Sequence, residues 1–383
     1  MKRSSWRKIR LRLAALLLGY LLAELLLVPV LLRFATIRHL VFLPRSLTVL
    51  AQSSKGGIVP RDYTLILGDS YAEGQGDWAD AGLARGGRPD YGSAHVLHER
   101  TGEDVITFGA GGANSVRALV KTPLRRRNAL RRFLVGEPAR VLVFFYEGND
   151  LDDNVLELRR ELAPGEGPEA LDVARIDAYL AGLAPRQRLG GWLDAFCLPG
   201  VVANAIEVAA EGRETAAEEG TGAEDLVVDV ARIAGRETPL ARRMNGPSLE
   251  LTPAELELGL RVFERSLAFC RGLYPGVELD VVYLPSPLAC YDLVGPTVSV
   301  RTYLGRSPLV PVERVQERSR EIRARVRALA AAAGVGFVDP TESLQARARE
   351  TPIHGPLDCN HFNEQGYRQL AEEILGASTA IRR

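Results

Sequence analysis

The sequence is poor in cysteine, with four among 383 residues, and no two of them form a Cys-x-x-Cys pair. Zinc sites built from closely spaced cysteine pairs are therefore not predicted. Positive and negative residues balance at 48 each, so no excess of one sign indicates a nucleic-acid partner. No Gly-x-Ser-x-Gly motif surrounds Ser70, which argues against the α/β-hydrolase fold. What remains is ordinary globular composition, 46% hydrophobic, in a chain long enough for a large core.

The N-terminus carries a membrane-anchor pattern. Lys and Arg residues crowd positions 2–12, and the apolar stretch 13–32 follows and ends at Arg33. About 20 apolar residues in a helix are enough to cross a bilayer. The basic cluster lies upstream, which predicts a cytoplasmic N-terminus and an extracytoplasmic, periplasmic remainder. The apolar run is longer than that of a typical signal peptide and no small-residue cleavage site follows it promptly, so we favour an uncleaved anchor.

The rest of the chain divides into a linker and one large domain. We expect residues 34–59 to form a juxtamembrane linker, with a short tether near Ser53–Gly57, and residues 60–378 to form the domain. Within it, residues 151–252 have sparse apolar residues and no clear strand. They are predicted to form a mostly helical insertion, either a cap that shapes substrate access or a solvated excursion without a role in the chemistry.

Apolar runs typical of buried strands alternate with helical patterns. The helix that begins after Thr252 carries a capping box with Glu255 at its third position. This alternation predicts an α/β fold, a doubly wound and mostly parallel sheet flanked by helices. The expected strands are 64–67, 104–108, 139–146, 277–284 and 336–339, and the expected helices are 91–100, 253–273, 312–333 and 364–375.

Small polar residues follow three of these strands. Ser70 comes directly after the first strand, a glycine-rich turn at 109–112 after the second, and Asn149 after the third. Parallel α/β sheets place their ligand sites at the carboxyl ends of the strands, so these residues are expected at one rim. Asp358 and His361 lie three residues apart before the last helix, a spacing that lets a carboxylate orient an imidazole. Each signal also has an ordinary structural explanation as a turn or a capping loop.

Together these blocks resemble the SGNH hydrolases, the GDSL-type esterase and acyltransferase family. The matching segments, which occur in the order of the family, are Gly68-Asp-Ser70, Phe108-Gly-Ala-Gly-Gly112, Gly148-Asn-Asp150 and Asp358-Cys-Asn-His361. The resemblance covers about residues 60–150 and 253–378, but neither the anchor nor the middle insertion. It implies a three-layer SGNH/flavodoxin-like fold and no metal or organic cofactor.

The resemblance also implies residue roles. Ser70 is the expected nucleophile, His361 the general base and then acid, and Asp358 the orienting carboxylate. The expected oxyanion donors are the Ser70 and Gly112 backbone N–H groups and the Asn149 side-chain amide. Gly112 is chosen over Gly109 and Gly111 by its spacing. Two positions depart from the usual pattern of the family. Thr107 replaces an Asn, which changes local turn bonding, and Tyr71 replaces a Leu.

The implied function is that of a membrane-anchored serine carboxyl-ester hydrolase, acting on an acylated carbohydrate or a small ester. An O-acyltransferase on a cell-envelope or exported polysaccharide would use the same residues, with a sugar hydroxyl in place of water. A third alternative is a catalytically silent glycan-binding module.

Other features are predicted to be structural. His95 and His98 are read as ordinary helix residues rather than metal ligands. The arginines at 125–127 and 131–132 are expected to form a solvated face. A Gly- and Asp-rich loop is expected at 74–87. One or two disulfides of unassigned pairing are allowed in an extracytoplasmic domain, and Cys359 is read as a bystander, although a disulfide there would stiffen its loop.

Overall fold

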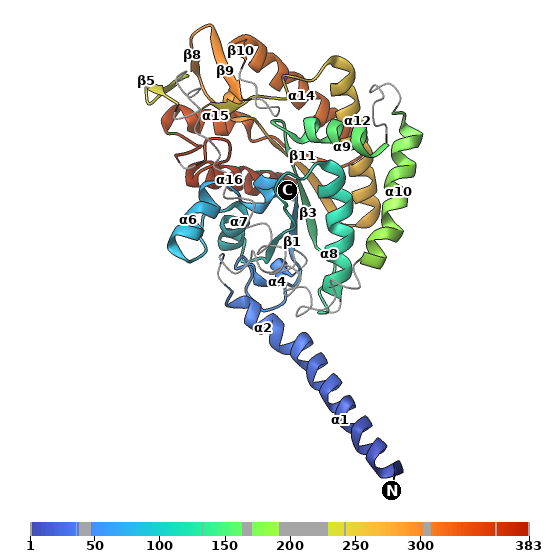
Figure 1. Ribbon diagram of the computed structural model, residues 1–383. Helices are drawn as coiled ribbons and strands as arrows, with labels where there is room; N and C mark the ends of the chain where they lie inside the picture. The colour runs from blue at the N-terminus through green and yellow to red at the C-terminus, as the bar shows by residue number, and fades with distance from the viewer. Residues whose placement is uncertain are drawn as a thin grey trace.

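The computed structural model has a domain at the end of a long N-terminal helix (Figure 1). It describes residues 2–35, 37, 47–131, 133–162, 171–190, 229–240, 243–301, 308–356 and 358–381.

A five-stranded sheet forms the centre of the domain, in the order β11-β7-β3-β1-β2. Every neighbouring pair in it is parallel. In register, Leu65 of β1 lies opposite Ile106 of β2 and Val141 of β3. The predicted parallel sheet is thus confirmed. The strands are β1 (Thr64–Leu67), β2 (Val105–Thr107), β3 (Arg140–Tyr146), β7 (Glu278–Leu284) and β11 (Gly336–Val338).

Helices cover both faces of this sheet because alternate side chains along each strand point to opposite sides. Leu65 and Val141 join one apolar cluster, whereas Ile66 and Leu142 join the other. Figure 1 shows α8, α10 and α12 on one side and α7, α15 and α16 on the other. The two buried faces explain why β1 and β3 are apolar throughout. The predicted doubly wound architecture is therefore confirmed.

The helices of the domain match the sequence patterns closely. At the start of α12, the Thr252 hydroxyl accepts the Glu255 N–H at 3.3 Å and the Glu255 carboxylate accepts the Thr252 N–H at 2.9 Å, which confirms the capping box. The helices are α4 (Thr48–Ala51), α5 (Ser70–Glu73), α6 (Asp77–Arg85), α7 (Ser93–Thr101), α8 (Thr122–Arg131), α9 (Asp150–Leu162), α10 (Val173–Gly190), α12 (Pro253–Leu273), α13 (Pro287–Cys290), α14 (Val312–Ala332), α15 (Thr341–Glu350) and α16 (Glu364–Ile381).

One expectation is corrected here. The segment expected as a loop at 74–87 contains α6, bounded by the positive-φ glycines Gly76 and Gly86, which act as helix ends rather than as loop residues. The three cysteines in the described part of the chain are buried and form no disulfide: Cys270, Cys290 and Cys359. The fourth, Cys197, lies outside the described residues.

The middle insertion is only partly described. Its described residues form α9 and α10, followed by short strands. Strands β4, β5 and β6 of the insertion pair with strands at 293–311, which lie beyond it, in two three-stranded sheets of order β5-β4-β8 and β10-β9-β6. The prediction placed no strands here, because runs of two to five residues carry little periodicity. The short strands are β4 (Val230–Ile233), β5 (Arg236–Pro239), β6 (Met244–Asn245), β8 (Leu293–Val294), β9 (Thr297–Arg301) and β10 (Leu309–Pro311).

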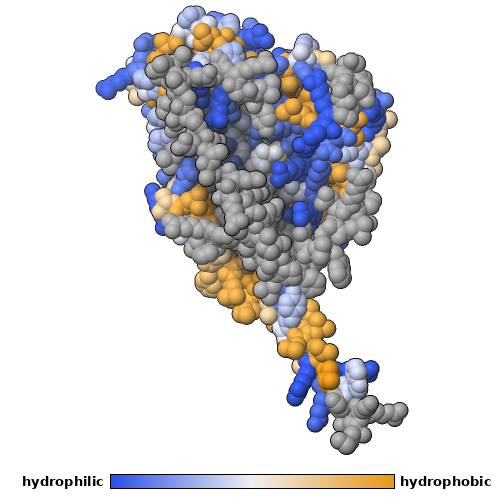
Figure 2. All heavy atoms as spheres, viewed as in Figure 1, coloured by the Kyte–Doolittle hydropathy of each residue, from blue (hydrophilic) through white to orange (hydrophobic). Residues whose placement is uncertain are grey.

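The N-terminal helix projects from the domain. It consists of α1 (Lys2–Leu22), a π-helical turn (Ala23–Leu27) and α2 (Val28–Arg33). Residues Trp6–Arg33 form one helix long and apolar enough to cross a membrane, and 17% of its most apolar window is buried. Figure 2 shows apolar side chains along this stem and hydrophilic ones toward its free end. By length and composition it is a candidate membrane anchor or signal sequence.

Residues 52–56 differ from the flexible tether expected there, because they close the open edge of the sheet at β2. The side-chain amide of Gln52 donates to the Thr107 carbonyl at 2.7 Å and accepts the Thr107 N–H at 2.8 Å. The Ser54 carbonyl accepts the Val105 N–H at 2.9 Å, and the Gly56 N–H donates to the Asp104 carboxylate at 2.7 Å. This segment satisfies backbone groups that an edge strand would otherwise expose. Of the juxtamembrane linker predicted at 34–59, residues 36 and 38–46 lie outside the described residues.

Candidate active site at the carboxyl end of the sheet

Ser70 lies where β1 ends, as the first residue of α5. Gly68 permits the sharp turn because any larger side chain there would lie 2.9 Å from the Cβ atoms of Ala72 and Phe144. Asp69 caps α5, accepting the Tyr71 N–H at 3.0 Å. These contacts hold the Ser70 hydroxyl at the rim of the sheet, where the side chain is 6% exposed.

His361 bridges Ser70 and Asp358. Its Nε2 lies 2.8 Å from Ser70 Oγ, and its Nδ1 lies 2.5 Å from Asp358 Oδ2. Burial alone would raise the pKa of Asp358, but the hydrogen bond and charge of His361 outweigh it and lower that pKa. An ionised Asp358 fixes the proton on Nδ1 and leaves Nε2 free to accept the Ser70 proton. The fold thus joins three residues that are up to 291 positions apart in the sequence.

Asp358 and His361 are held by neighbours that the sequence did not single out. The Asp77 carboxylate, at the start of α6, accepts the Asp358 N–H at 2.8 Å. The Tyr71 ring centroid lies 5.0 Å from that of His361, and the Tyr71 hydroxyl donates to the Asn360 carbonyl at 2.6 Å. Tyr71, the departure from the usual Leu, therefore supports the loop that carries the imidazole.

Gly76 packs directly against the imidazole. Its φ is +86°, and a Cβ atom there would lie 2.5 Å from His361 Cβ and 3.4 Å from Asp358 Oδ2. Contacts this short are not tolerated, so the position requires glycine on both conformational and steric grounds. The sequence analysis treated Gly76 and Asp77 only as parts of a polar loop. The glycines at 76 and 86, which bound α6, could have indicated a helix that begins at Asp77.

The loop after β2 presents three glycine amides, and two of them are engaged. The Gly109 N–H donates to Thr107 Oγ1 at 2.9 Å, and the Gly111 N–H donates to the Glu73 carboxylate at 2.5 Å. The Gly112 N–H has no hydrogen-bond partner among the described residues, and its φ is +60°. Of the three, Gly112 is thus the amide left available to a ligand. Thr107 indeed alters the turn bonding, because its hydroxyl also donates to the Ala72 carbonyl.

Asn149 lies in the turn between β3 and α9, and its side chain is half-buried. Its Oδ1 is buried without a hydrogen-bond partner in the described structure, and its Nδ2 donates a hydrogen bond to none of the described residues. Buried amides are usually satisfied by the protein, so this one is available to a ligand. Asn149 therefore follows its strand as the sequence predicted, with an uncommitted amide.

The arginine run on α8 is not uniformly solvated, which corrects the prediction for Arg126. This side chain is 4% exposed, and its guanidinium lies 5.3 Å from the centroid of the Phe108 ring. It donates to the carbonyls of Thr107 and Gly109 at 3.3 and 3.4 Å. Arg126 thus braces the glycine loop from below. Neighbouring arginines of α8 differ in burial, since Arg125 is exposed and Arg126 is buried. The sequence shows only a continuous run of like charge there, so it did not reveal this difference.

Two carboxylates lie buried beside Ser70. Burial raises the pKa of Asp69 to about 6, and burial together with the charge of Asp69 raises that of Asp150 well above its usual value. Asp69 Oδ2 lies 3.3 Å from Ser70 Oγ, a longer contact than the one to His361. The imidazole is therefore the nearer of the two acceptors available to the serine hydroxyl.

No group of three or more His, Cys, Asp or Glu side chains in the described ranges could hold a metal ion. His95 and His98 have separate partners, at 2.7 Å from Ser53 Oγ and 2.6 Å from the Glu103 carbonyl.

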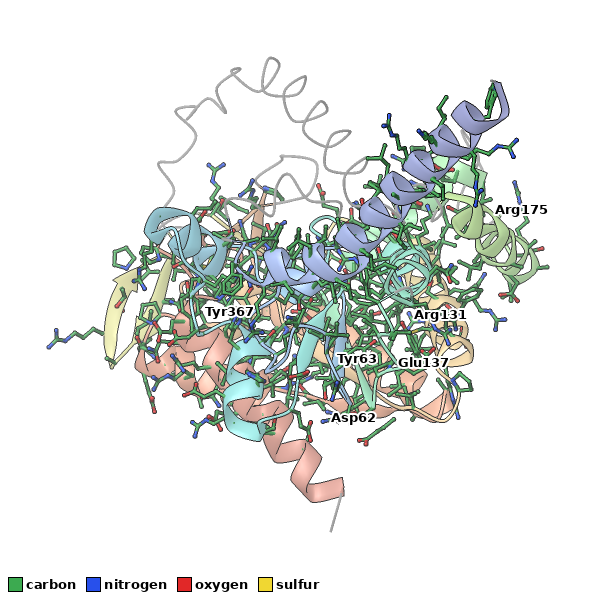
Figure 3. All side chains as sticks on the ribbon, turned by 90° about the horizontal axis from the view of Figure 1, so that it is seen from below. Asp62, Tyr63, Arg131, Glu137, Arg175 and Tyr367 are labelled. Carbon is green, nitrogen blue, oxygen red and sulfur yellow. The ribbon has the colours of Figure 1, made fainter. Side chains whose placement is uncertain are left out.

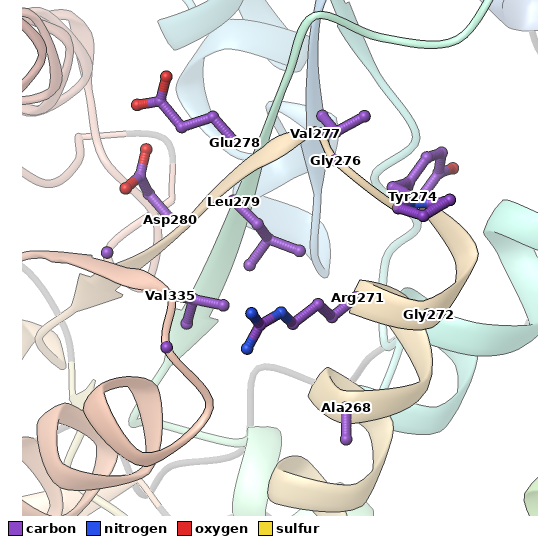
Figure 4. Close-up of a pocket in the computed structure, with 13 residues that line it drawn as sticks. Ala268, Arg271, Gly272, Tyr274, Gly276, Val277, Glu278, Leu279, Asp280 and Val335 are labelled. Carbon is purple, nitrogen blue, oxygen red and sulfur yellow. The ribbon is translucent and has the colours of Figure 1, made fainter.

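A separate hollow of about 820 Å³ lies at the other end of the sheet (Figure 4). Arg271, Glu278 and Asp280 line it, at the end of α12 and the start of β7. Asp280 is already paired with Arg140 at 2.5 Å. This hollow is not part of the Ser70 site, which lies at the carboxyl ends of the strands.

Comparison with known protein families gives a match over most of the chain. The family model described as the GDSL-like lipase/acylhydrolase family matches residues 66–369, a span that includes Ser70, Gly112, Asn149, Asp358 and His361. No curated protein matches the sequence significantly.

Several solved structures are similar to this chain at low identity. A phospholipase A1 from Streptomyces albidoflavus is 12% identical with a TM-score of 0.37, covering 82% of this chain and 98% of its own. An extracellular lipase from Streptomyces rimosus is 13% identical with a TM-score of 0.37, and the match covers 82% of this chain and 99% of the lipase. A lipase/acylhydrolase from Enterococcus faecalis is 11% identical with a TM-score of 0.33, covering 82% and 94%.

Proposed function

The chain belongs to the GDSL-like lipase/acylhydrolase family, and from this premise we propose that it is a serine carboxyl-ester hydrolase acting through an acyl-Ser70 intermediate. The observation that carries the proposal is the hydrogen-bonded chain from Ser70 Oγ through His361 to Asp358. A serine with its base at 2.8 Å and an orienting carboxylate behind the base is the arrangement that nucleophilic ester cleavage requires.

The proposed reaction has two halves. Ser70 Oγ attacks the ester carbonyl carbon while His361 Nε2 takes the hydroxyl proton, and the carbonyl oxygen becomes an oxyanion. The intermediate collapses, the C–O bond to the alcohol breaks, and His361 returns the proton to the departing alkoxide. Water then attacks the acyl-serine with His361 again as base, which releases the carboxylic acid and restores Ser70.

The oxyanion of both halves is proposed to accept from the Ser70 N–H, the Gly112 N–H and the Asn149 amide. The Gly112 and Asn149 groups lack partners in the described structure, so they need not break a protein hydrogen bond to donate. Preorganised donors of this kind each contribute roughly 10²–10³ in rate.

We further propose that the N-terminal helix anchors the enzyme and that the domain is extracytoplasmic. Two observations support an anchor over a cleaved signal sequence. Leu32 is 6% exposed and belongs to the core cluster that contains Leu65. Arg33 donates to the carbonyls of Gly56 and Gly57 at 3.2 and 2.6 Å. Because the end of the helix is part of the domain, cleavage would remove packed residues. The proposed substrate is an acylated carbohydrate or a small ester.

A test of the nucleophile uses the full-length chain in detergent with a fluorophosphonate probe, located by mass spectrometry, and turnover of p-nitrophenyl acetate. Ser70→Ala is expected to abolish the adduct and the turnover. Ser53→Ala is the matched control, because Ser53 also contacts a histidine, His95 at 2.7 Å, but is exposed and far from the glycine loop in sequence. Ser53→Ala is expected to retain both.

The outcomes separate the candidate functions. An adduct on Ser70 with turnover supports the hydrolase. An adduct with little turnover, restored by a sugar acceptor, would instead identify an O-acyltransferase, in which a sugar hydroxyl replaces water in the second half. No adduct at all would contradict both and favour a glycan-binding module.

A further inference from the structure

The helix end is joined to the amino end of the sheet, opposite Ser70. Arg33 contacts the carbonyls of residues 55–57, and the Gly56 N–H in turn donates to Asp104, the residue before β2. The Lys55 ammonium is buried and donates to the carbonyls of Gly57 and Ile58 at 3.0 and 2.9 Å. These hydrogen bonds to backbone groups hold the domain in a fixed position relative to the N-terminal helix, which a flexible linker would not do.

Exposed apolar side chains gather at this same end. Phe34, directly after α2, is 76% exposed, and Ile58, before β1, is 38% exposed. Leu134, in the turn between α8 and β3, is 91% exposed. Single exposed apolar residues are ordinary, but these three directly follow the membrane-length helix or lie near the amino ends of β1 and β3, the end of the sheet to which the helix is joined.

Leu134 is presented outward by its own backbone. Its φ is +59°, a left-handed conformation that is unfavourable for leucine, and the residues on either side of it, Phe133 and Val135, are buried. The turn is also tied to β1, because the Tyr63 hydroxyl donates to the Gly136 carbonyl at 3.2 Å. The turn therefore holds a leucine in water at a conformational cost of about 1 kcal/mol or more.

Charged residues surround these apolar ones. Arg61 and Arg131 are exposed, while the acidic Glu137 is paired with Arg127 at 2.7 Å and lies 3.6 Å from Arg131. Asp62 is also exposed. Seen from below, Asp62, Arg131 and Glu137 lie on the side of the domain from which the helix emerges (Figure 3). Arginine beside apolar residues is typical of surfaces that rest on lipid headgroups.

We propose that Phe34, Ile58 and Leu134, with Arg61 and Arg131, form a docking face that rests on the outer surface of the membrane that the N-terminal helix crosses. This inference depends on the proposed anchoring, but not on the proposed chemistry. The domain then stands upright on the bilayer instead of tumbling at the end of a tether.

The docking face determines how far the active site lies from the bilayer surface. Ser70, Gly112 and Asn149 follow the carboxyl ends of β1, β2 and β3, whereas the docking face lies at the amino ends. The seven residues of β3 span about 20 Å at about 3.3 Å per residue. Esters of lipids embedded in that bilayer would not reach Ser70. The substrate class that fits is an ester carried on a chain that extends into the aqueous phase, such as a polysaccharide.

The experiment compares two exposed leucines. Leu134→Cys and Leu309→Cys, 91% and 64% exposed, place an environment-sensitive fluorophore near the amino end of β3 and on β10, which lies far from the helix in Figure 1. The full chain is reconstituted in vesicles of phosphatidylcholine and phosphatidylglycerol that contain a lipid bearing a quencher just below the headgroup. Labelling of the parent chain gives the background.

We expect the probe at 134 to be blue-shifted and quenched several-fold more than the probe at 309. Arg33→Ala, which releases the stem, is expected to reduce quenching at 134. Equal quenching at the two positions in vesicle-bound protein would overturn the docking face and leave the anchor intact. Protein that does not float with the vesicles would overturn the anchor and the docking face together. Turnover of p-nitrophenyl acetate, measured on the same samples, reports separately on the proposed chemistry.

Discussion

The two ends of the parallel sheet differ in whether their polar groups have hydrogen-bond partners. At the carboxyl end, polar groups such as the Asn149 amide and the Gly112 N–H have no partners in the described structure. At the amino end, polar groups are paired, as in Arg140 with Asp280 and Arg33 with backbone carbonyls. The Gly112 N–H is exposed, but the Asn149 side chain is partly buried, where a group without a partner costs stability and is kept for a ligand to satisfy. The comparison implies that substitutions at the carboxyl end change rate, whereas those at the amino end change stability.

The largest effect is expected from removing the base. His361→Ala leaves Ser70 without a proton acceptor and should lower kcat by about 10⁴-fold or more, with little change in melting temperature. Steady-state turnover of p-nitrophenyl acetate measures it. His98→Ala is the matched control, because His98 contacts a backbone carbonyl instead. A comparable loss in both variants would show that the effect arises from folding.

At the amino end, Asp280→Ala should destabilise the protein by about 3–5 kcal/mol, because it leaves the buried Arg140 without its closest partner. Chemical denaturation measures the change. Glu278 contacts the same arginine at 3.6 Å but is exposed, so Glu278→Ala should cost less than about 1 kcal/mol. If Asp280→Ala lowered kcat in protein that remained folded, the division between the two ends would be wrong.

At the carboxyl end, removing one oxyanion donor should also lower kcat strongly, though less than removing the base. Asn149→Ala is expected to lower kcat by roughly 10²–10³ while KM changes little, because the amide is needed only when the oxyanion forms. Labelling by a fluorophosphonate should also slow, since that reaction passes through a similar charge. An unchanged kcat would remove Asn149 from the proposed donor set.

A smaller effect is expected from Gly76→Ala, which brings a methyl group against the His361 side chain. We expect about a 10- to 100-fold loss in kcat, since a displaced base loses its alignment with Ser70. Gly86→Ala is the matched control. Gly86 has φ of +68° and bounds the same helix, but a Cβ atom there meets nothing within 4 Å. The two variants should lose similar stability, and a similar loss of rate would argue against the positioning role.

The smallest effect concerns pH. Burial, followed by the charge of His361, lowers the pKa of His354 from 6.5 to about 3. Below pH 6.5 the unfolded chain takes up a proton that the folded chain does not, so stability falls as the pH decreases toward 3. His354→Gln removes this contribution, and its melting temperature should depend less steeply on pH between 7 and 5. Parallel slopes for the variant and the parent would contradict the assignment.

How far the sequence predicted this structure depends on the range of the interaction. The buried strands and the capping box of α12 are local patterns, so they were predicted within about a residue. The site blocks were found because each follows a strand, and the strand ends of a parallel sheet converge. Asp77 and Arg126 were missed because their roles depend on contacts with residues far away in the chain, which no local periodicity records. Likewise, the edge closure by Gln52 and Ser54 looked like a linker because its hydrogen bonds are long-range.

The central claim is that an acyl group forms on Ser70 through activation by His361. The most direct test is rapid quenching of the full-length chain with p-nitrophenyl acetate, followed by peptide mass spectrometry. We expect a burst of p-nitrophenol and one added acetyl group on the peptide that contains Ser70, both lost in Ser70→Ala. Turnover that persists in Ser70→Ala, or an acetyl group found only on another residue, would contradict it.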